Sequence, residues 1–232
     1  MPADKLLVDA DDNMHDDRIL LTIDDGPSER AGALLDYLME RRIGAILFCE
    51  GAKLRDRRGE AIRAIKEGYI IGNHSYDHPF FEQLLEGQAM EQIAKTDYEI
   101  ELLHRSAQRQ RAARYFRFPY GNGCDIEVHQ RLLRQRGYWS PFGGAQCDWR
   151  WDIEVRDWRV DAGNVAGKLD FAKGRLTGTL PRRKVLLLHD HPLNFELELF
   201  QNICQAVLDA GLRFWTNDDL FEQAVAGPTG SG

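Results

Sequence analysis

Two adjacent carboxylates follow an apolar stretch near the start of the chain, where residues 20–27 read L-L-T-I-D-D-G-P. Asp24 and Asp25 repel each other when both are ionised, and the turn that follows needs neither, because Gly26 and Pro27 already supply it. The pair is therefore either a solvated acidic turn or part of a site in which a cation lies between the two charges. A solvated turn does not explain why the carboxylates directly follow an apolar strand, so the sequence favours the cation.

Two histidines four residues apart could bind the same cation. His74 and His78, in N-H-S-Y-D-H-P, have an H-x-x-x-H spacing that lets both imidazoles face one ion, from a helical turn or from a tight loop. Pro79 disfavours a helical conformation at His78, so we predict a loop. Two histidines and one aspartate leave positions open for water and substrate, as in a catalytic rather than a structural metal site. The second aspartate would then stay free as a general base, beside a cation that lowers the pKa of water toward about 7.

An arginine and a third histidine complete a set that could hydrolyse an amide. Arg117 lies in R-F-P-Y-G and His189 in V-L-L-L-H-D-H-P, each where an apolar run ends. Arg117 beside a carboxylate favours the ionised form of that group, and a histidine titrates near neutrality, as a general acid should. Amide hydrolysis needs an activated water, a donor to the oxyanion and an acid for the leaving amine. The alternatives are a surface salt bridge for Arg117 and a buried histidine satisfied by Asp190 for His189.

Apolar runs and helical periodicity predict the elements that must position these residues. Strands are expected over residues 18–23, 45–49, 69–71, 115–118, 185–188 and 212–215, with shorter candidates over 138–140 and 151–155, and helices over 29–42, 59–67, 82–108, 125–136, 161–173 and 195–210. The longest helix places Leu85, Ile93, Ile100 and Leu103 on its inner face. Strands that alternate with helices predict an α/β fold with a parallel sheet, open or closed into a barrel. Chemistry in barrels gathers where the strands end, and the candidate residues lie there.

Five short motifs occur in a fixed order along the chain: T-I-D-D-G-P, H-S-Y-D-H-P, R-F-P-Y, E-V-R-D-W and L-L-L-H-D. Together they resemble the five motifs of the NodB-homology polysaccharide deacetylases, carbohydrate esterase family 4, over residues 18–215. The resemblance implies a distorted (β/α) barrel with seven or eight parallel strands. It also implies a metal-dependent hydrolase that removes N-acetyl groups from N-acetylglucosamine-type residues of a polysaccharide such as peptidoglycan or chitin.

The resemblance implies catalytic and metal-binding roles for the matching residues. Asp24 corresponds to the catalytic base and Asp25 to a metal ligand, with His74 and His78 completing the metal site. His189 corresponds to the general acid that protonates the leaving amine. Zn²⁺ is the default cation for two histidines and one aspartate, with Co²⁺ or Ni²⁺ as substitutes.

Other motif residues correspond to positioning groups and to the substrate-binding surface. Arg117 would hold Asp24 and pair with Asp157, and Ser75 would brace the histidine loop through a hydrogen bond. The residues implied at the substrate are Pro119 and Tyr120 in R-F-P-Y, with the Tyr120 N–H stabilising the oxyanion, Trp158 as a wall of the sugar groove and Leu187 beside the acetyl methyl group. The alternative for Trp158 is a core aromatic.

The composition is that of one large soluble domain. The 232 residues include 43% hydrophobic and 29% charged residues. We expect an acidic, disordered leader over residues 1–17, one catalytic domain over 18–225 and a flexible tail over 226–232. A net charge of −7 argues against nucleic acid or an anionic membrane as the main partner, because both favour basic proteins. The expected partner is an N-acetylated polysaccharide or oligosaccharide, bound by a monomer with no membrane span.

Location and the state of the thiols are less constrained. The first residues have no long apolar segment typical of a signal peptide, so the chain as written is expected to stay in the cytoplasm. The resemblance instead implies secretion or the cell envelope. The four cysteines, Cys49, Cys124, Cys147 and Cys204, form no C-x-x-C pair, and we expect free or buried thiols, with a Cys124–Cys147 bridge as the alternative.

Two other functions fit parts of the same pattern. The same residues could cleave an O-acetyl ester, as on xylan, because an ester has a better leaving group than an amide. The chain could also be a carbohydrate-binding module that has lost catalysis. A complete set of metal ligands, base and acid argues against the module, because a protein that only binds has no need of all three.

Overall fold

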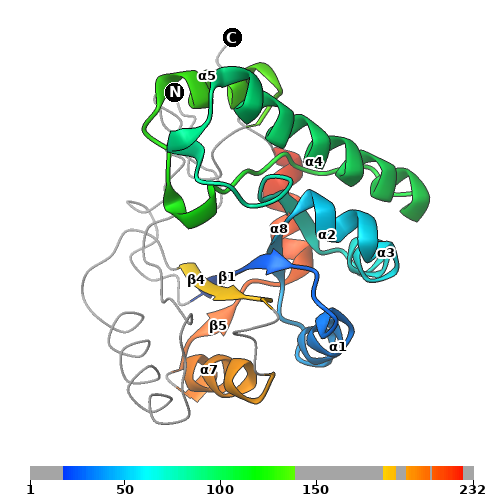
Figure 1. The fold of residues 1–232 in the computed structure, drawn as a ribbon. Helices are drawn as coiled ribbons and strands as arrows, with labels where there is room; N and C mark the ends of the chain where they lie inside the picture. The colour runs from blue at the N-terminus through cyan, green and yellow to red at the C-terminus, as the bar shows by residue number, and fades with distance from the viewer. Residues whose placement is uncertain (1–17, 139–184, 192–196, 210, 227–232) are drawn as a thin grey trace.

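The computed structural model describes residues 18–138, 185–191, 197–209 and 211–226 (Figure 1). The elements in chain order are β1 (Arg18–Gly26), α1 (Ala31–Glu40), β2 (Ala45–Cys49), α2 (Gly51–Asp56), α3 (Arg58–Lys66), β3 (Ile70–Asn73), η1 (Phe81–Gln83), α4 (Glu86–Ala107), η2 (Pro119–Gly121), α5 (Glu127–Gln135), β4 (Val185–His189), α7 (Leu197–Asp209), β5 (Arg213–Phe214) and α8 (Asn217–Ala226). Among these residues, no helix is long and apolar enough to cross a membrane.

The described strands form one parallel sheet, as the strand–helix alternation predicts. Four of them lie in the order β3-β2-β1-β4, and β5 pairs with the N-terminal end of β1. The register aligns Asp24 of β1 with Phe48 of β2 on one side and with His189 of β4 on the other. Because all these strands are parallel, their carboxyl ends meet at one edge of the sheet.

The two faces of the sheet have different partners because successive strand residues point to opposite sides. One face packs against α1, α3 and α7 through buried apolar side chains that include Leu21, Leu47, Leu188, Leu38, Ala64 and Ile203. The other face carries Leu20, Ile46, Phe48 and Val185, which pack with Tyr115 and Trp215. Asp24 and His189 follow the alternation of this second face.

Several predicted boundaries were wrong. The helix predicted over 82–108 is a short turn, η1, followed by α4, because the Leu85 N–H donates to Gln88 Oε1 and begins a new helix there. Leu85 is consequently 74% exposed, whereas Ile93, Ile100 and Leu103 are buried as predicted. The strand predicted over 115–118 is an extended segment with one bridge, between Phe116 and Asn73.

Helices α2 and α8 were not predicted. The sequence does signal the start of α8, because Thr216 and Asp219 exchange hydrogen bonds in the T-x-x-D pattern of a capping box. The strand predicted over 151–155, the helix over 161–173 and most of the strand over 138–140 lie outside the described residues. Cys49 and Cys204 are buried free thiols, as expected. Cys147 lies outside the described residues, so the Cys124–Cys147 alternative stays a prediction.

Candidate active site

The candidate residues converge at the carboxyl ends of the strands. Asp24 and Asp25 lie at the carboxyl end of β1, His74 directly follows β3, and His189 ends β4. Asp24 and His189 are aligned partners on neighbouring strands, so their side chains leave the sheet on the same face. The fold therefore brings together residues that are up to 165 residues apart in the sequence, from Asp24 to His189.

Three ligand-type atoms face one another at this edge. Asp25 Oδ1 lies 3.3 Å from His74 Nε2 and 3.1 Å from His78 Nε2, and the two nitrogens are 3.2 Å apart. Zinc ligands about 2.0–2.1 Å from one ion at tetrahedral angles lie about 3.3–3.4 Å apart, close to these spacings. No hydrogen bond of good geometry reaches Asp25 Oδ1, although the atom is buried. The donor set and its spacing fit a divalent cation.

The tautomer of His74 also fits a metal ligand. His74 Nδ1 lies 2.9 Å from the backbone carbonyl oxygen of Arg117, which can only accept a hydrogen bond. Nδ1 therefore carries the proton, and in the neutral ring Nε2 presents a lone pair to Asp25 and His78. A carbonyl that fixes the second ring nitrogen is the usual outer partner of a metal-binding histidine.

The charges of the aspartates and of the histidines in this cluster shift one another's pKa values. Burial raises the pKa of Asp25, but the imidazoles of His74 and His78 outweigh burial and hold this pKa well below its usual range. Burial lowers the pKa of His74, but the negative charges of Asp24 and Asp25 outweigh it and raise this pKa. The carboxylates thus attract positive charge to this position, which a bound cation or a proton on His74 can supply.

The second carboxylate is held apart from the three ligand atoms. Asp24 Oδ1 accepts a hydrogen bond of 2.6 Å from Arg117, whose guanidinium also contacts Thr22 Oγ1 at 2.9 Å. Asp24 Oδ2 lies on the other side, 3.8 Å from His74 Nε2. Asp24 and Arg117 are both buried, so this ion pair is shielded from solvent. One carboxylate oxygen is therefore fixed by Arg117 while the other faces the cluster.

Backbone strain concentrates at this site. Six non-glycine residues in the described segments have positive φ, and four of them are Asp25, Ser75, His78 and Tyr120, with φ between 58° and 67°. Residues other than glycine rarely adopt this region, although Asn, Asp and His tolerate it better than the rest, and the strain costs of order 1–3 kcal/mol at such positions. Contacts compensate for part of it, since Ser75 Oγ accepts a hydrogen bond from the His78 N–H at 3.1 Å.

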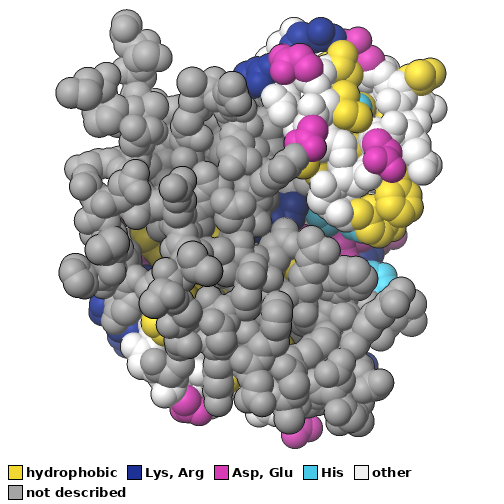
Figure 2. Space-filling model, turned by 90° about the vertical axis from the view of Figure 1, so that its left-hand side faces the viewer, with side chains coloured by type: hydrophobic (Ala, Val, Ile, Leu, Met, Phe, Trp, Pro, Cys, Tyr) yellow, Lys and Arg dark blue, Asp and Glu magenta, His cyan; other side chains and the backbone are white. Residues whose placement is uncertain are grey.

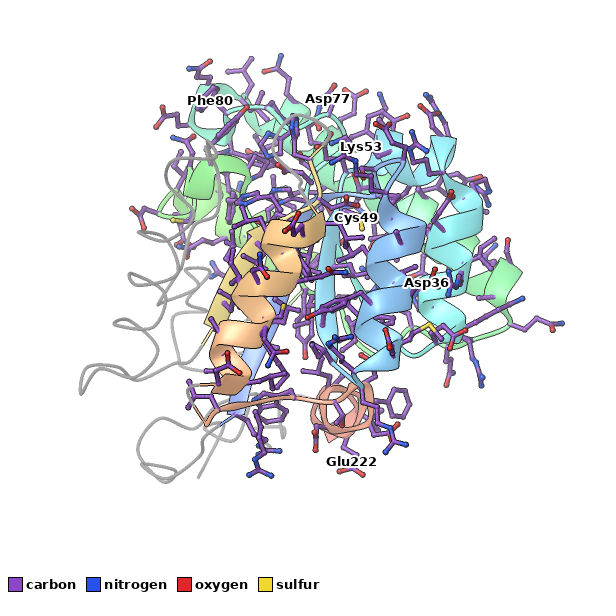
Figure 3. All side chains as sticks on the ribbon, turned by 90° about the horizontal axis from the view of Figure 1, so that it is seen from below. Asp36, Cys49, Lys53, Asp77, Phe80 and Glu222 are labelled. Carbon is purple, nitrogen blue, oxygen red and sulfur yellow. The ribbon has the colours of Figure 1, made fainter. Side chains whose placement is uncertain are left out.

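A lysine outside the five sequence motifs contacts the backbone of Asp25. Lys53 Nζ, on α2, donates to the backbone carbonyl of Asp25 at 2.7 Å and to Glu50 Oε1 at 2.8 Å. The Glu50 N–H donates to the Gly26 carbonyl, and the Gly51 N–H donates to the Ser75 carbonyl. This short segment after β2 therefore links the aspartate loop to the histidine loop. Figure 3 shows Lys53 at the same end of the molecule as Cys49 and Asp77.

The Lys53→Met substitution is expected to weaken zinc binding about tenfold, the lower range for loss of an outer partner of a metal ligand. Methionine keeps the apolar stem but removes the hydrogen bond that stabilises the left-handed Asp25 backbone. Zinc affinity measured by competition with a chromogenic chelator tests this. Lys95→Met is the matched control, because Lys95 pairs with Glu91 on the exposed side of α4. Equal zinc affinity in the two variants would show that Lys53 does not position Asp25.

The structure also places the remaining predicted residues. Leu187 is buried and aligned with Thr22, two positions before His189 on the same face of β4. Pro119 is buried at the start of η2, and Tyr120 is exposed, with its ring edge against His78 at a centroid distance of 4.5 Å. Asp157 and Trp158 lie outside the described residues, so their roles stay predictions.

The carboxylate of Asp190 binds Ser28. Its two carboxylate oxygens accept hydrogen bonds from the N–H and the hydroxyl of Ser28. The Asp190 N–H donates to the Asp24 carbonyl at 2.8 Å. Asp190 therefore fixes the turn that follows the aspartate pair, and its carboxylate is already occupied by Ser28.

Comparison with known proteins identifies the class. The sequence model of the polysaccharide deacetylase family matches residues 11–138, more than half of the chain, so the chain belongs to this family. The peptidoglycan-N-acetylglucosamine deacetylase of Bacillus cereus is 28% identical over 209 residues, which cover 88% of this chain and 68% of that protein. A family 4 carbohydrate esterase from Streptomyces lividans, solved in complex with acetate, is 25% identical with a TM-score of 0.64, covering 85% of this chain and 91% of that one.

The similarity to known proteins covers only part of the length of several relatives and extends to a protein described as a pseudoenzyme. Other curated relatives are longer, and this chain spans between 27% and 60% of their lengths. A Bacillus anthracis protein described as a family 4 pseudoenzyme has the same fold, with a TM-score of 0.64, 18% identity, and coverage of 90% of this chain and 66% of that one. Since a pseudoenzyme can share this fold, activity has to be argued from the site itself.

Proposed function

We propose that this chain is a metal-dependent hydrolase that removes N-acetyl groups from N-acetylglucosamine-type residues of a polysaccharide. The observation that carries the proposal is the cluster of Asp25, His74 and His78 next to a second carboxylate, Asp24, that Arg117 holds in place. A cation held by Asp25, His74 and His78 would polarise the acetyl carbonyl and lower the pKa of water, and zinc is the default for this donor set.

Residues of the chain supply the proton transfers and the orientation. Asp24 Oδ2 faces the cluster and takes a proton from the attacking water, while Arg117 holds the carboxylate in place through the contact to Oδ1. His189, aligned with Asp24 across the β1–β4 pair, gives a proton to the nitrogen of the leaving amine. The Tyr120 N–H donates a hydrogen bond to the negative oxygen of the tetrahedral intermediate.

The relatives support an acetylated polysaccharide as the substrate. The Bacillus cereus relative is described as a peptidoglycan-N-acetylglucosamine deacetylase, and a chitin deacetylase of Cryptococcus neoformans is also among the similar proteins. The same residues could act on an O-acetyl ester, because an ester and an amide pass through similar tetrahedral intermediates. An N-acetylated polymer is the function that we favour, because a general acid matters most for a poor amine leaving group.

Acetate release with and without metal tests the proposal. The chain is stripped with a chelator, then assayed before and after zinc is restored, on N-acetylglucosamine oligomers and on acetylated xylan. We expect release from the oligomers only in the presence of zinc, with Co²⁺ also restoring activity. Release from xylan alone would make the chain an esterase with the same site. Release from neither would leave a carbohydrate-binding protein, and equal activity without metal would contradict the assigned cluster.

A further inference from the structure

Two exposed aromatic rings extend from the metal cluster. Phe80 and Tyr120 stack with centroids 4.1 Å apart and planes 12° from parallel, and they are 44% and 57% exposed. Tyr120 in turn contacts the His78 ring at 4.5 Å, and the His78 ring lies 4.9 Å from that of His74. A continuous row of rings therefore leads from a metal-ligating histidine to solvent. Figure 2 shows exposed hydrophobic side chains close to histidine side chains on one face of the molecule.

The orientation of Phe80 is not explained by the core. Its neighbour in sequence, Phe81, is fully buried in a cluster with Phe116 and Phe118, and it begins the short η1 turn. Phe80, one residue earlier, is exposed and stacks on the ring of Tyr120 instead. Of these two adjacent phenylalanines, Phe81 therefore packs in the core and Phe80 lies at the rim of the site. Large apolar groups left exposed together commonly mark a binding surface.

Tyr120 adopts an unfavourable backbone conformation at this position. Its φ of 58° and ψ of 7° lie in the left-handed region, which a bulky side chain rarely adopts. The surrounding structure stabilises this conformation in a residue whose ring is more than half exposed, so burial does not account for it. Such strain at a site commonly accompanies function. The ring is aligned by His78 on one side and Phe80 on the other.

We propose that Phe80, aligned by Tyr120, forms a sugar-binding subsite for the residue next to the acetylated one in the polysaccharide. The ring of Phe80 is two ring contacts away from His78, so a sugar that packs on it is not the sugar whose acetyl group reaches the metal ligands. The apolar C–H face of a pyranose ring packs flat against an aromatic ring, while its hydroxyl groups stay in water. The inference rests on the proposed function, and it makes the chain selective for oligomers over single acetylated groups.

The test compares a long and a short substrate. Zinc-loaded Phe80→Ala is assayed on the N-acetylglucosamine pentamer and on 4-nitrophenyl acetate, which occupies only the acetyl position. We expect the KM for the pentamer to rise about tenfold, and kcat/KM for the aryl ester to change less than about twofold. Phe80→Trp should retain the wild-type KM, because it keeps an aromatic face. Phe221→Ala is the matched control, since Phe221 is 51% exposed on α8, whose labelled residue Glu222 lies at the opposite end of the molecule from Phe80 in Figure 3.

Two outcomes would overturn the subsite. Equal KM values for the pentamer in Phe80→Ala and Phe221→Ala would mean that no sugar packs on Phe80. An equal loss on both substrates in Phe80→Ala would mean that the residue acts on the metal cluster through Tyr120 and His78 and not on a sugar.

Calorimetric binding of the pentamer to the same proteins separates the subsite from the proposed activity. Pentamer binding that is lost only in Phe80→Ala supports the subsite even if the wild-type protein releases no acetate, in which case only the proposed activity fails. A wild-type protein that neither binds nor deacetylates the pentamer overturns both. Acetate release and pentamer binding that both persist in Phe80→Ala overturn the subsite alone.

Discussion

Turnover of an N-acetylglucosamine oligomer is expected to fall by about 10²–10⁴-fold when Asp24 is replaced by asparagine, because this is the usual contribution of a general base. Asparagine has the same shape and its side-chain oxygen can still accept the hydrogen bond from Arg117, which now goes to Asp24 Oδ1. It cannot take a proton from water. Zinc should remain bound, because the three ligand atoms belong to Asp25, His74 and His78.

The measurement combines kcat on the oligomer with zinc content and thermal unfolding of the same preparation. Unfolding has to be followed because Asp24 and Arg117 form a buried ion pair, and loss of one charge from such a pair is destabilising. Asp36→Asn is the matched control, since Asp36 pairs with Arg63 on an exposed surface that Figure 3 shows away from Lys53 and Phe80. It should keep zinc, stability and turnover.

The separation of zinc content from turnover decides the assignment of the two aspartates. A folded Asp24→Asn protein with full zinc and most of its turnover would mean that another group is the base. A protein that loses zinc instead would mean that Asp24 is a ligand, and that the contact of 3.8 Å to His74 tightens when metal binds.

The position of the site was predictable from the sequence for a simple reason. Parallel strands bring their carboxyl ends to one edge, so polar residues that end successive apolar runs have to meet there. That argument correctly brought Asp24, His74, Arg117 and His189 together, although the strand around Arg117 is only an extended segment with one bridge. The order of the strands was not needed for the prediction.

Which of the two aspartates faces the histidines depends on local backbone geometry, and the spacing of residues in the sequence does not encode it. The register of β1 and β2 shifts between Asp24 and Gly26, and Asp25 has φ of 66°, which turns its carboxylate toward the histidines. From the residues alone, either aspartate could have been the ligand, and only the family resemblance distinguished them. In the structure, Arg117 contacts Asp24, whereas Asp25 Oδ1 lies 3.3 Å from His74 Nε2 and 3.1 Å from His78 Nε2.

Lys53 and Phe80 could not have been found by residue type. A lysine two positions into a short helix and a phenylalanine next to another phenylalanine are ordinary in any chain of this composition. Their importance lies in what they touch, the carbonyl of Asp25 and the ring of Tyr120, and both contacts join segments that are far apart in sequence. Left-handed residues other than glycine are equally hard to predict, because tertiary contacts impose the conformation against local preference.

Loss of a metal ligand should have the largest effect on metal content. His78→Ala is expected to lower zinc affinity by more than about 100-fold, because removal of an outer partner alone costs about 10–100-fold, and to abolish zinc-dependent acetate release. His78 is the ligand to test because it is partly exposed, whereas His74 is buried and also bonds to the Arg117 carbonyl, so its loss would disturb Arg117 as well. Zinc content after dialysis and the rise in melting temperature on zinc addition provide the measurement.

A second variant at position 78 separates the loss of a metal ligand from the effect of backbone strain. His78 has φ of 61°, which alanine tolerates poorly, so His78→Asn is the better-matched change, because asparagine tolerates the left-handed region. Both variants should bind little zinc, and the asparagine variant should unfold without metal near the temperature of the metal-free wild type. His191→Ala, which removes an imidazole that is not part of the group formed by Asp25, His74 and His78, should keep its zinc. Full zinc occupancy in His78→Asn would falsify the assignment of the metal ligands, whereas loss in both His78 variants but not in His191→Ala leaves His78 as the ligand.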